Sequence, residues 1–343
     1  MNRILVVLPN WFGETLFATP FLRALREGSP GSHLATLGWP QCREVLLQNP
    51  RVDEILTYDE RGAHRTIGGK LRALQLVRRG RFNTAFILRK SLSRSLLLVL
   101  AGVPRRIGFA NPKSGWLLTD RVLPASAPAH KASSYLPLLG AANLHPVQHA
   151  YEYWVSDGER CAAAELVPPA QAGDPRPLIV MHPGANWPHK RWPADRFAAV
   201  GDRLAAAHGA QIAITGGPDD QPLAEAIRQR MRQPALLLAG RTTLRTLAAC
   251  LQQARLVIAA DTGVLHIACA LRRPVVALYG PTSPARTGPL GDPQRTVVLH
   301  HPDCCPQIPC YDPDRPSHAG MHAITVEEVS RAADALLAQR VGA

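Results

Sequence analysis

The stretch RLVIAADTGVLHIACALRRPVVALYGPTSPARTGPLG, residues 255–291, decides the fold. Its two apolar runs, 256–260 and 275–279, are typical of strands that are buried on both faces of a parallel sheet. The apolar residues between the runs recur at the spacing of one helical face: Val264, Ile267, Ala268 and Leu271. Pro274 ends that helix before the second run begins. The stretch therefore predicts a strand–helix–strand unit of an α/β protein.

The polar residues of this unit lie where its first strand ends and its helix begins. Asp261 follows the strand, and Thr262 and Gly263 open the helix, with His266 in its first turn. Ligands of open α/β sheets bind outside the carboxyl ends of the strands, and the free N–H groups of a helix start suit a phosphate. A plain Asp-Thr helix cap with a packed histidine is the alternative interpretation.

A second stretch, MHPGANWPHKRWP at 181–193, has the same layout. A predicted strand at 178–181 is followed by a loop with Gly184, Ala185 and Asn186, and a helix is expected from about residue 194. Lys190 is the single lysine of this loop in a chain with 34 arginines and five lysines, and its point charge can neutralise a leaving phosphate. The alternative is a solvated lysine beside Arg191.

Strands and helices alternate along the whole chain. We expect strands at 3–9, 33–37, 52–58, 82–88, 178–181, 210–215, 236–239, 256–260, 275–279 and 296–299, and helices at 41–48, 70–79, 93–101 and 325–339. Alternation of this kind predicts parallel sheets covered by helices. Residues 168–177, PPAQAGDPRP, are typical of a linker. The resulting division is an N-terminal domain 1–167, a linker 168–177, a C-terminal domain 178–323 and a last segment 324–343.

Glu14 also lies after a predicted strand and before a helix. That helix is expected to start near Phe17, which puts Pro20 in the first turn. A carboxylate in this position can accept a proton from a substrate hydroxyl, which makes Glu14 the candidate general base. The alternative is a carboxylate that only favours the helix N-terminus through the helix dipole.

The composition is that of a globular protein with an uneven charge. Of 343 residues 46% are hydrophobic and 19% charged, and we find neither a signal peptide nor an apolar run of the about 20 residues that span a bilayer. We therefore expect a cytoplasmic protein, with its seven cysteines reduced. Residues 1–155 carry 20 Lys and Arg against 9 Asp and Glu, whereas the remainder carries 19 against 17.

A basic excess in one half predicts an anionic partner for that half, although a solubilising surface is the alternative. Nucleic acid, anionic lipid and phosphorylated glycolipid all qualify as partners. The chain lacks zinc-finger spacing, a basic helix and the aromatic motifs of RNA-binding domains, so we do not expect nucleic acid. The candidate basic residues are Arg89, Lys90, Arg94, Arg105, Arg106, Arg121 and His130.

Cysteine and histidine residues crowd the segment 300–322: His300, His301, Cys304, Cys305, Cys310, His318 and His322. Soft ligands so close together raise the question of zinc or iron. The segment lacks a C-x-x-C pair, so we predict no metal ligands among these residues. Metal binding by the segment stays an open alternative.

Six motifs along the chain resemble those of glycosyltransferase family 9, which contains the ADP-heptose–lipopolysaccharide heptosyltransferases. They are NWFGETLFATPFLRAL at 10–25, HPGA…KRWP, TGGPDD at 215–220, LAGRTTL at 238–244, DTGVLH and YGPTSP. The resemblance implies a GT-B fold, in which two Rossmann-like domains face each other across a cleft and the last helix packs back toward the first domain.

The resemblance also implies an activity: inverting, metal-independent transfer of heptose from ADP-heptose to the inner core of lipopolysaccharide, without a cofactor. Glu14 matches the position of the family's catalytic base, which is usually an aspartate. The carboxylate of Glu14 therefore lies one methylene further from the backbone. Lys190 and the helix start at Thr262 and Gly263 would stabilise the departing ADP, and Asp261 would hold the sugar or orient Lys190. The implied donor-binding residues are Gly184, Ala185, Asn186, Gly216, Gly217, Thr242, Thr262, Gly263 and His266.

The acceptor implied by the resemblance is an anionic glycolipid, Kdo-lipid A or the heptosylated core. It would bind the basic residues of the first domain at the inner face of the inner membrane. The NWFG motif is similar to enzymes that add the second heptose, and DTG to those that add the first. Another GT-B enzyme, with a different sugar donor or an epimerase activity, stays an alternative, and a basic nucleic-acid-binding protein is a more distant one.

Overall fold

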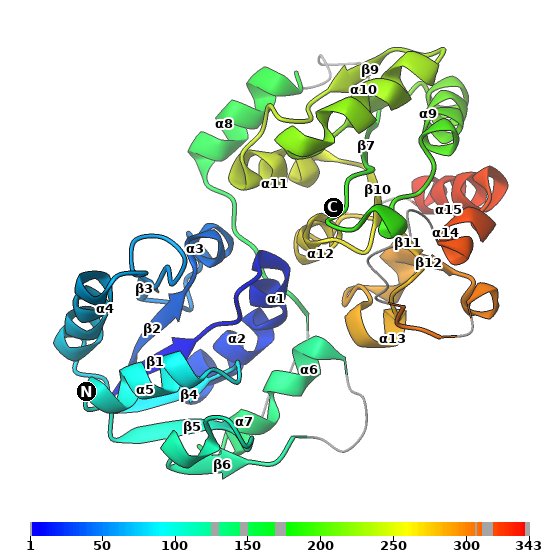
Figure 1. Cartoon of the computed structure of the whole chain (residues 1–343). Coiled ribbons are helices and arrows are strands. Elements are labelled where there is room, and N and C mark those ends of the chain that lie inside the picture. The colour runs from blue at the N-terminus through cyan, green and yellow to red at the C-terminus, as the bar shows by residue number, and fades with distance from the viewer. Residues whose placement is uncertain are drawn as a thin grey trace. The chain divides into compact units, whose positions relative to one another are not determined.

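The computed structural model describes residues 2–124, 130–144, 150–168, 176–305, 307–310 and 318–339. The chain divides into two compact units, Met1–Trp154 and Val155–Ala343. Each unit holds one sheet of six parallel strands with helices on its faces (Figure 1). The predicted α/β class with parallel sheets is confirmed. Most of the predicted linker, residues 169–175, lies outside the described residues.

The first unit has the strand order β3-β2-β1-β4-β5-β6. Its strands are β1 (Arg3–Val7), β2 (His33–Gly38), β3 (Glu54–Thr57), β4 (Thr84–Ile87), β5 (Arg105–Phe109) and β6 (Asp120–Val122). Its helices are α1 (Phe12–Phe17), α2 (Thr19–Gly28), α3 (Pro40–Leu46), α4 (Ile67–Arg79), α5 (Leu92–Leu100), α6 (Lys131–Tyr135) and α7 (Pro137–Gly140), with a 3₁₀ turn η1 (Gly115–Leu117). The central strand β1 is fully apolar after Arg3 because helices cover both of its faces.

Two short helices, rather than one, follow β1. Helix α1 already begins at Phe12, so Glu14 lies in its first turn instead of in a loop. The chain bends at Ala18, where the Thr19 hydroxyl donates to Leu16 O at 2.7 Å, and α2 then begins with Pro20 in its first turn. The predicted position of Pro20 in a first turn is thereby confirmed. Proline is tolerated there because the N–H of a first-turn residue has no partner within the helix.

The second unit has the strand order β12-β11-β10-β7-β8-β9. Its strands are β7 (Leu178–His182), β8 (Gln211–Ile214), β9 (Ala235–Leu237), β10 (Leu256–Ala260), β11 (Val275–Tyr279) and β12 (Thr296–His300). Its helices are α8 (Asp157–Leu166), α9 (Ala194–His208), α10 (Gln221–Arg230), α11 (Leu244–Gln253), α12 (Gly263–Ala270), α13 (Pro284–Thr287), α14 (Ala319–Ala323) and α15 (Val326–Ala338). Short 3₁₀ turns are η2 (Pro188–Lys190), η3 (Pro218–Asp220), η4 (Pro293–Arg295) and η5 (Pro302–Cys304).

The last helix, α15, belongs to the core of the second unit. It packs on α9 and on β10, β11 and β12. Its buried residues Val329, Ala333 and Leu336 share one apolar cluster with those of α9. The Trp192 indole, at the start of α9, donates to Ile324 O at 3.0 Å and fixes the entry to α15.

Candidate active site

The loops that the sequence singled out meet along the carboxyl edge of the second sheet. Strands β7, β8, β9 and β10 are parallel, so their carboxyl ends share one edge. Gly184, Gly216, Thr242 and Asp261 follow these four strands in that order. The Gly240 amide donates to Gly216 O at 3.0 Å, which joins the loops after β8 and β9.

Asp261 and Lys190 form the ion pair at the centre of this edge. The Lys190 ammonium lies 2.9 Å from Asp261 Oδ2 and 3.3 Å from the Asp261 carbonyl oxygen. Both side chains are largely buried, with 17% of the lysine and 9% of the aspartate side chain exposed. The ammonium also lies 5.3 Å from the centre of the Trp187 ring, which orients it from a second side. The geometry thus joins two of the predicted catalytic residues.

Three further side chains surround the Asp261 carboxylate. His266 Nε2 lies 3.6 Å from Oδ1. The Tyr279 hydroxyl lies 3.3 Å from Oδ1 and donates to Thr287 O at 2.7 Å, while the Thr287 hydroxyl lies 3.4 Å from Oδ2. Burial alone would raise the pKa of Asp261, but the hydrogen bond from His266 and the charge of Lys190 outweigh it, and this pKa lies well below its usual range. The carboxylate is therefore ionised at neutral pH and holds Lys190 in place.

The start of α12 presents polar groups that have no protein partner in the described structure. Thr262 precedes the helix, but its side chain accepts no capping hydrogen bond, so the alternative of a plain cap is not supported at Thr262. The Thr262 and Thr282 hydroxyls are buried without a hydrogen-bond partner among the described residues. They follow the neighbouring strands β10 and β11. Two such hydroxyls beside the free amides of a helix start can bind phosphate oxygens.

The glycines of the neighbouring loops make room for a carboxylate that the sequence did not single out. A Cβ at Gly184 would lie 2.3 Å from Asp220 Oδ2, and one at Gly216 would lie 2.6 Å from Asp220 Cβ. The Gly217 amide donates to Asp220 Oδ2 at 3.0 Å, and Arg191 donates to Oδ1 at 3.1 Å. Asp220 therefore ties the loops after β7 and β8 together. Its close approach explains why Gly184 and Gly216 have no side chain.

His182 ends β7 directly below this edge. It is buried, and its Nδ1 lies 3.0 Å from the Thr215 hydroxyl. Burial lowers the pKa of His182 to about 4, although the charge of Asp220 opposes that effect. The ring is therefore neutral at physiological pH.

In the first unit, Glu14 lies at the carboxyl edge of the sheet beside α6. Its Oε1 accepts a hydrogen bond from Lys131 Nζ at 3.0 Å. Both side chains are partly exposed, 26% for the glutamate and 38% for the lysine, so a substrate can reach the carboxylate. Burial raises the pKa of the neighbouring Tyr135, and the charge of Glu14 adds to that effect. His130 caps α6 by accepting from the Ala132 amide at 3.1 Å.

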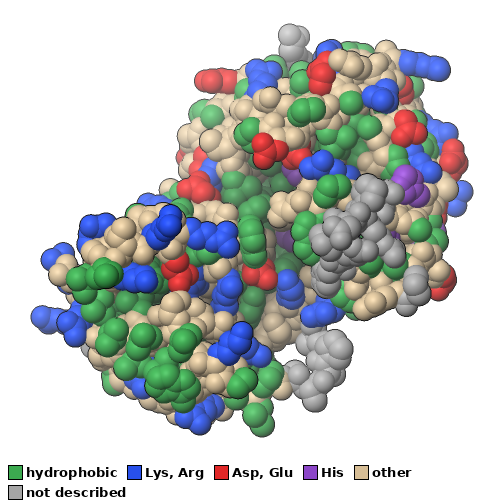
Figure 2. All heavy atoms as spheres, viewed as in Figure 1, with side chains coloured by type: hydrophobic (Ala, Val, Ile, Leu, Met, Phe, Trp, Pro, Cys, Tyr) green, Lys and Arg blue, Asp and Glu red, His purple; other side chains and the backbone are tan. Residues whose placement is uncertain are grey.

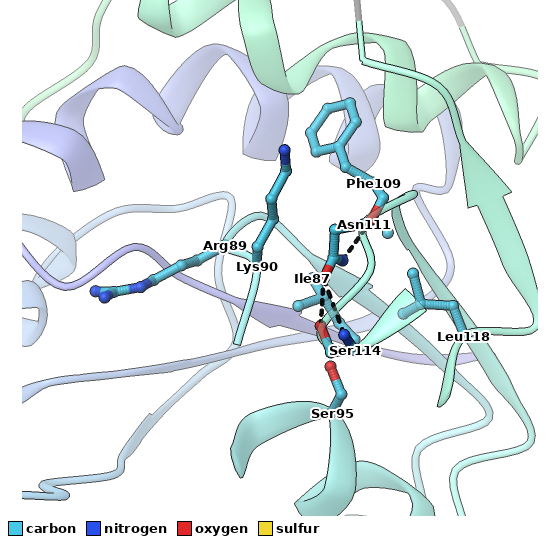
Figure 3. A pocket seen from close by; sticks show the side chains of 9 residues that line it. Ile87, Arg89, Lys90, Ser95, Phe109, Asn111, Ser114 and Leu118 are labelled. Carbon is cyan, nitrogen blue, oxygen red and sulfur yellow. Dashed lines mark hydrogen bonds between the residues drawn. The ribbon is translucent and has the colours of Figure 1, made fainter. Parts of the chain in front are cut away.

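Arg89 and Lys90 lie at the same edge, after β4, and are exposed. They form the rim of a small pocket at the carboxyl ends of β4 and β5, whose floor carries Ser95, Asn111 and Ser114 (Figure 3). Asn111 Oδ1 accepts hydrogen bonds from the Ser114 amide and hydroxyl at 2.9 and 3.1 Å. The Arg89 side chain extends away from this floor in Figure 3, and two exposed cations at one sheet edge can bind an anionic sugar substituent.

Arg94 lies beneath the surface instead. Its side chain is 1% exposed, and its guanidinium donates to Leu8 O and Asn10 Oδ1, both at 2.7 Å, and pairs with Glu60 at 3.1 Å. It therefore supports the loop between β1 and α1 and is turned toward protein groups.

Arg105 and Arg106 lie at the opposite edge of the first sheet, because they begin β5 whereas Arg89 follows β4. Arg105 pairs with Asp120 at 2.9 Å, and Arg106 donates to Leu117 O at 2.8 Å. Arg121 is exposed on the edge strand β6. The structure therefore does not bring these three arginines together with Arg89, Lys90 and Glu14.

Sequence reasoning assigned no site role to three residues of these edges, Asp220, Tyr279 and Thr287, and it counted Lys131 among the basic residues without predicting its contact with Glu14. Tyr279 ends a strand that was predicted, and it opens the YGPTSP motif, so the motif itself was the available signal. Lys131 lies 117 residues from Glu14 in the chain, and no local pattern connects the two.

Known proteins resemble this chain over most of its length. Residues 71–313 match the model of glycosyltransferase family 9 (heptosyltransferase). The chain is 29% identical over 313 residues to the lipopolysaccharide heptosyltransferase 2 of Salmonella typhimurium, covering 87% of this chain and 88% of that protein.

Two solved structures are similar over nearly the whole length. One is the Escherichia coli ADP-heptose lipopolysaccharide heptosyltransferase II, with a TM-score of 0.82, 26% identity and 98% coverage of both chains. The other is a family 9 glycosyltransferase from Veillonella parvula, with a TM-score of 0.86, 27% identity and coverage of 98% of this chain and 97% of that one. The predicted fold of two Rossmann-like units is confirmed. No helix among the described residues is long and apolar enough to cross a membrane.

Proposed function

Because this chain belongs to glycosyltransferase family 9, we propose that it transfers heptose from ADP-heptose to the inner core of lipopolysaccharide. The observation that carries the proposal is the buried Lys190–Asp261 pair at the start of α12, in a chain whose relatives are named as heptosyltransferases. A largely buried lysine beside free helix amides is suited to a leaving diphosphate.

The second unit binds the donor in this proposal. The α12 amides at Thr262 and Gly263, with the buried Thr262 and Thr282 hydroxyls, bind the diphosphate oxygens. Lys190 neutralises the charge that develops on the phosphate oxygen as its bond to the sugar C1 breaks. Asp261 orients Lys190, and Tyr279 and Thr287 hold Asp261.

The first unit binds the acceptor and supplies the base. Glu14 takes the proton of the acceptor hydroxyl, whose oxygen then forms the new bond to C1 on the face opposite the diphosphate. Lys131 donates a hydrogen bond to Glu14 Oε1 at 3.0 Å and orients this carboxylate. Arg89 and Lys90, with the pocket floor at Ser95, Asn111 and Ser114, bind carboxylate or phosphate groups of the acceptor. Arg94 positions Asn10 and thereby the loop that leads to Glu14.

We assign the second core heptose as the transferred group, so the acceptor is a core that already carries one heptose. The support is the name of the Salmonella relative, a heptosyltransferase 2, together with the NWFG motif at 10–13.

A donor and acceptor panel tests this function. ADP-heptose and other sugar nucleotides are supplied with heptose-free and singly heptosylated Kdo-lipid A, and the products are identified by mass spectrometry. We expect addition of one heptose to the singly heptosylated acceptor from ADP-heptose. Consumption of a different sugar nucleotide, or conversion of a donor without any acceptor, would instead identify another transferase or an epimerase.

An exposed apolar face of the first unit supports a membrane-surface location. Leu92, Leu96, Val99 and Leu100 repeat at one face of α5 and are exposed, although the opposite face of that helix is buried. Helix α4 packs beside α5 and adds Ile67, 79% exposed, and Leu71. The 3₁₀ turn η1, which also contacts α5, adds Trp116, 65% exposed.

Basic residues surround this apolar face. Lys70 and Arg72 are exposed on α4, and Arg89 and Lys90 precede α5. Figure 2 shows hydrophobic side chains with Lys and Arg around them on this unit. Apolar groups ringed by cations match a bilayer with anionic headgroups, where each cation contributes about 1 kcal/mol. We therefore propose that this face rests on the membrane that carries the glycolipid acceptor.

Vesicle sedimentation tests this location. The Leu96→Gln/Leu100→Gln variant should bind vesicles of anionic phospholipid several-fold more weakly than the wild type, while its ADP affinity stays unchanged. Val298→Gln, at an exposed apolar position of the second unit, is the matched control. Equal vesicle binding by all three proteins would contradict the proposed surface.

A further inference from the structure

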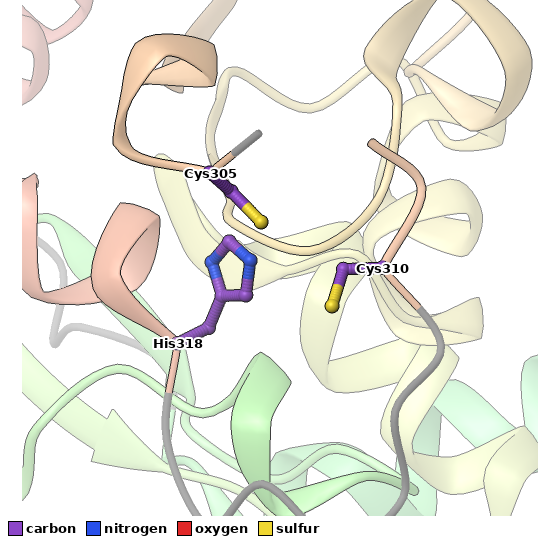
Figure 4. Close-up of side chains that lie close together, drawn as sticks. All are labelled: Cys305, Cys310 and His318. Atoms are coloured by element: carbon purple, nitrogen blue, oxygen red, sulfur yellow. The ribbon is translucent and has the colours of Figure 1, made fainter. Parts of the chain in front are cut away.

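The fold brings two cysteines and a histidine of the segment after β12 into one cluster. Ligand atoms of Cys305, Cys310 and His318 all lie within 4.8 Å of one another. Figure 4 shows the three side chains converging from three separate parts of the backbone. We propose that these three residues bind one zinc ion, which fixes this segment to the core of the second unit.

The ligand set and its surroundings suit zinc. Two thiolates and an imidazole are typical zinc ligands, with Zn–S bonds of about 2.3 Å, so two bound sulfurs lie at most about 4.6 Å apart. The ligand atoms lie within 4.8 Å of one another here, so a small inward movement of the side chains brings them to bonding distance of one ion. Cys305 and His318 are 8% and 2% exposed, so the ion would be enclosed on the protein side. These three ligands would leave the fourth position of a four-coordinate zinc open to a water molecule.

The backbone around the cluster already holds two of the ligands near the sheet. The Cys310 amide donates to Pro281 O at 2.7 Å, in the loop that leaves β11. His318 directly precedes α14, and α14 contacts both η5 and β11. A Cβ at Gly280 would lie 2.4 Å from Met321 Cγ of α14, so this helix approaches the same loop closely.

Zinc binding changes the protonation of all three ligands in a defined way. The Cys305 thiol donates to Gln307 O at 3.3 Å, so it carries a proton that the metal displaces. The Cys310 thiol also loses its proton. His318 Nδ1 accepts from the Gly320 amide at 3.1 Å as the cap of α14. Ligation through Nε2 moves the ring proton to Nδ1, and ligation through Nδ1 occupies its lone pair, so either mode gives up this cap.

The ion would act as a structural clip and take no part in the transfer step. It links η5, the chain after it and the start of α14, and the Cys310–Pro281 hydrogen bond connects them to the loop before α13. That loop leads to Thr287, whose hydroxyl lies 3.4 Å from Asp261 Oδ2. These ligands form no C-x-x-C motif, because four residues separate Cys305 from Cys310 and seven separate Cys310 from His318.

Metal analysis of the purified full-length protein tests the site. Elemental analysis should find about one zinc per chain, and metal-free protein should bind Zn²⁺ with that stoichiometry in competition with a chromogenic chelator. Co²⁺ in place of zinc should give a thiolate charge-transfer band. Cys310→Ser and His318→Ala should each weaken Zn²⁺ binding by more than the about 10–100-fold that loss of an outer-shell partner costs. Zinc removal from the wild type should lower the Tm by at least about 2 °C.

Cys304→Ser and His322→Ala are the matched controls, because both are exposed neighbours outside the cluster. Both should keep the full zinc stoichiometry and the cobalt band. Three results would overturn the site. They are wild-type protein that binds no stoichiometric Zn²⁺, an equal loss in the Cys304→Ser control, and a Cys305–Cys310 disulfide found by mass spectrometry in protein purified with zinc present. The titration of wild-type protein decides the question even if Cys310→Ser does not fold.

Discussion

The two units share one architecture and differ in what fills the carboxyl edge of the sheet. In the second unit that edge holds a largely buried ion pair, Lys190–Asp261, held by Tyr279 and Thr287. In the first unit the corresponding edge holds a partly exposed pair, Glu14–Lys131. A buried pair is costly to desolvate and its charges are fixed, which suits a lasting role in phosphate binding. An exposed carboxylate can exchange protons with a substrate, which suits a base.

The surfaces of the two units differ in their charge and in their exposed apolar residues. Residues 1–155 carry 20 basic against 9 acidic residues, whereas residues 156–343 carry 19 against 17. The basic unit also has the exposed apolar face of α4 and α5. A parallel sheet with helices therefore provides only the scaffold, and the side chains at its carboxyl edge and surface decide which substrate each unit serves.

The largest expected effect comes from Glu14. Glu14→Gln removes the proton acceptor but keeps the shape of the side chain, so turnover should fall by about 10²–10⁴-fold. Steady-state ADP release measures it. Glu27→Gln, at a 48% exposed glutamate of the same unit, is the control and should turn over like the wild type. Near-normal turnover of Glu14→Gln would show that Glu14 is not the base, and the proposed difference in role between the two edges would be wrong.

A smaller effect is expected at the basic rim of the first unit. Arg89→Gln/Lys90→Gln should raise the acceptor KM about 30-fold at low salt, since each of the two lost cations costs about 1 kcal/mol against an anionic partner. The acceptor KM of the wild type should rise with ionic strength, and that of the variant should rise less. Arg79→Gln, at an exposed arginine that ends α4, is the charge-matched control. A salt-independent acceptor KM would mean that this charge only keeps the protein soluble.

The smallest effect concerns stability and belongs to the second unit. His182 has a pKa of about 4 in the fold, below the ordinary value of 6.5, because burial disfavours its charged form. The unfolded chain takes up this proton first, so stability should fall as the pH drops from 6.5 to 4, by up to about 3 kcal/mol.

Urea denaturation at a series of pH values measures this slope. His182→Asn should be less stable at neutral pH and should show a shallower loss on acidification, while His322→Asn, at an exposed site, should keep the wild-type slope. A wild-type slope in His182→Asn would show that other groups cause the acid sensitivity.

Much of the fold could be predicted because the central strands are apolar runs. β7, β10 and β11 are buried at every position and were expected within a residue or two. β5 and β6 were missed, since RRIGF and DRV are short and charged, and only the neighbouring strand shows that they belong to the sheet. At the break between α1 and α2, Pro20 has no N–H to donate to Leu16 O, and the Thr19 hydroxyl donates to that carbonyl instead.

The candidate site was predictable where a motif follows a strand. Lys190 and Asp261 came from such positions, and the fold brings them to 2.9 Å. The basic residues were not separable by sequence, because a charge excess does not distinguish the buried Arg94 from the exposed Arg89. A charge excess also does not show that Arg105 begins its strand and therefore lies at the opposite edge of the sheet. The partners Lys131 and Asp220 depend on contacts between loops that the pattern of one segment does not contain.

The division of work between the units is tested most directly by titration calorimetry with ADP. Lys190→Ala should bind ADP about 10–100-fold more weakly, because a charge-assisted hydrogen bond contributes about 1.5–3 kcal/mol. Glu14→Gln should bind ADP like the wild type although it no longer turns over. Unchanged ADP affinity in Lys190→Ala, or an equal loss in Glu14→Gln, would contradict the assignment of the donor to the second unit and of the base to the first.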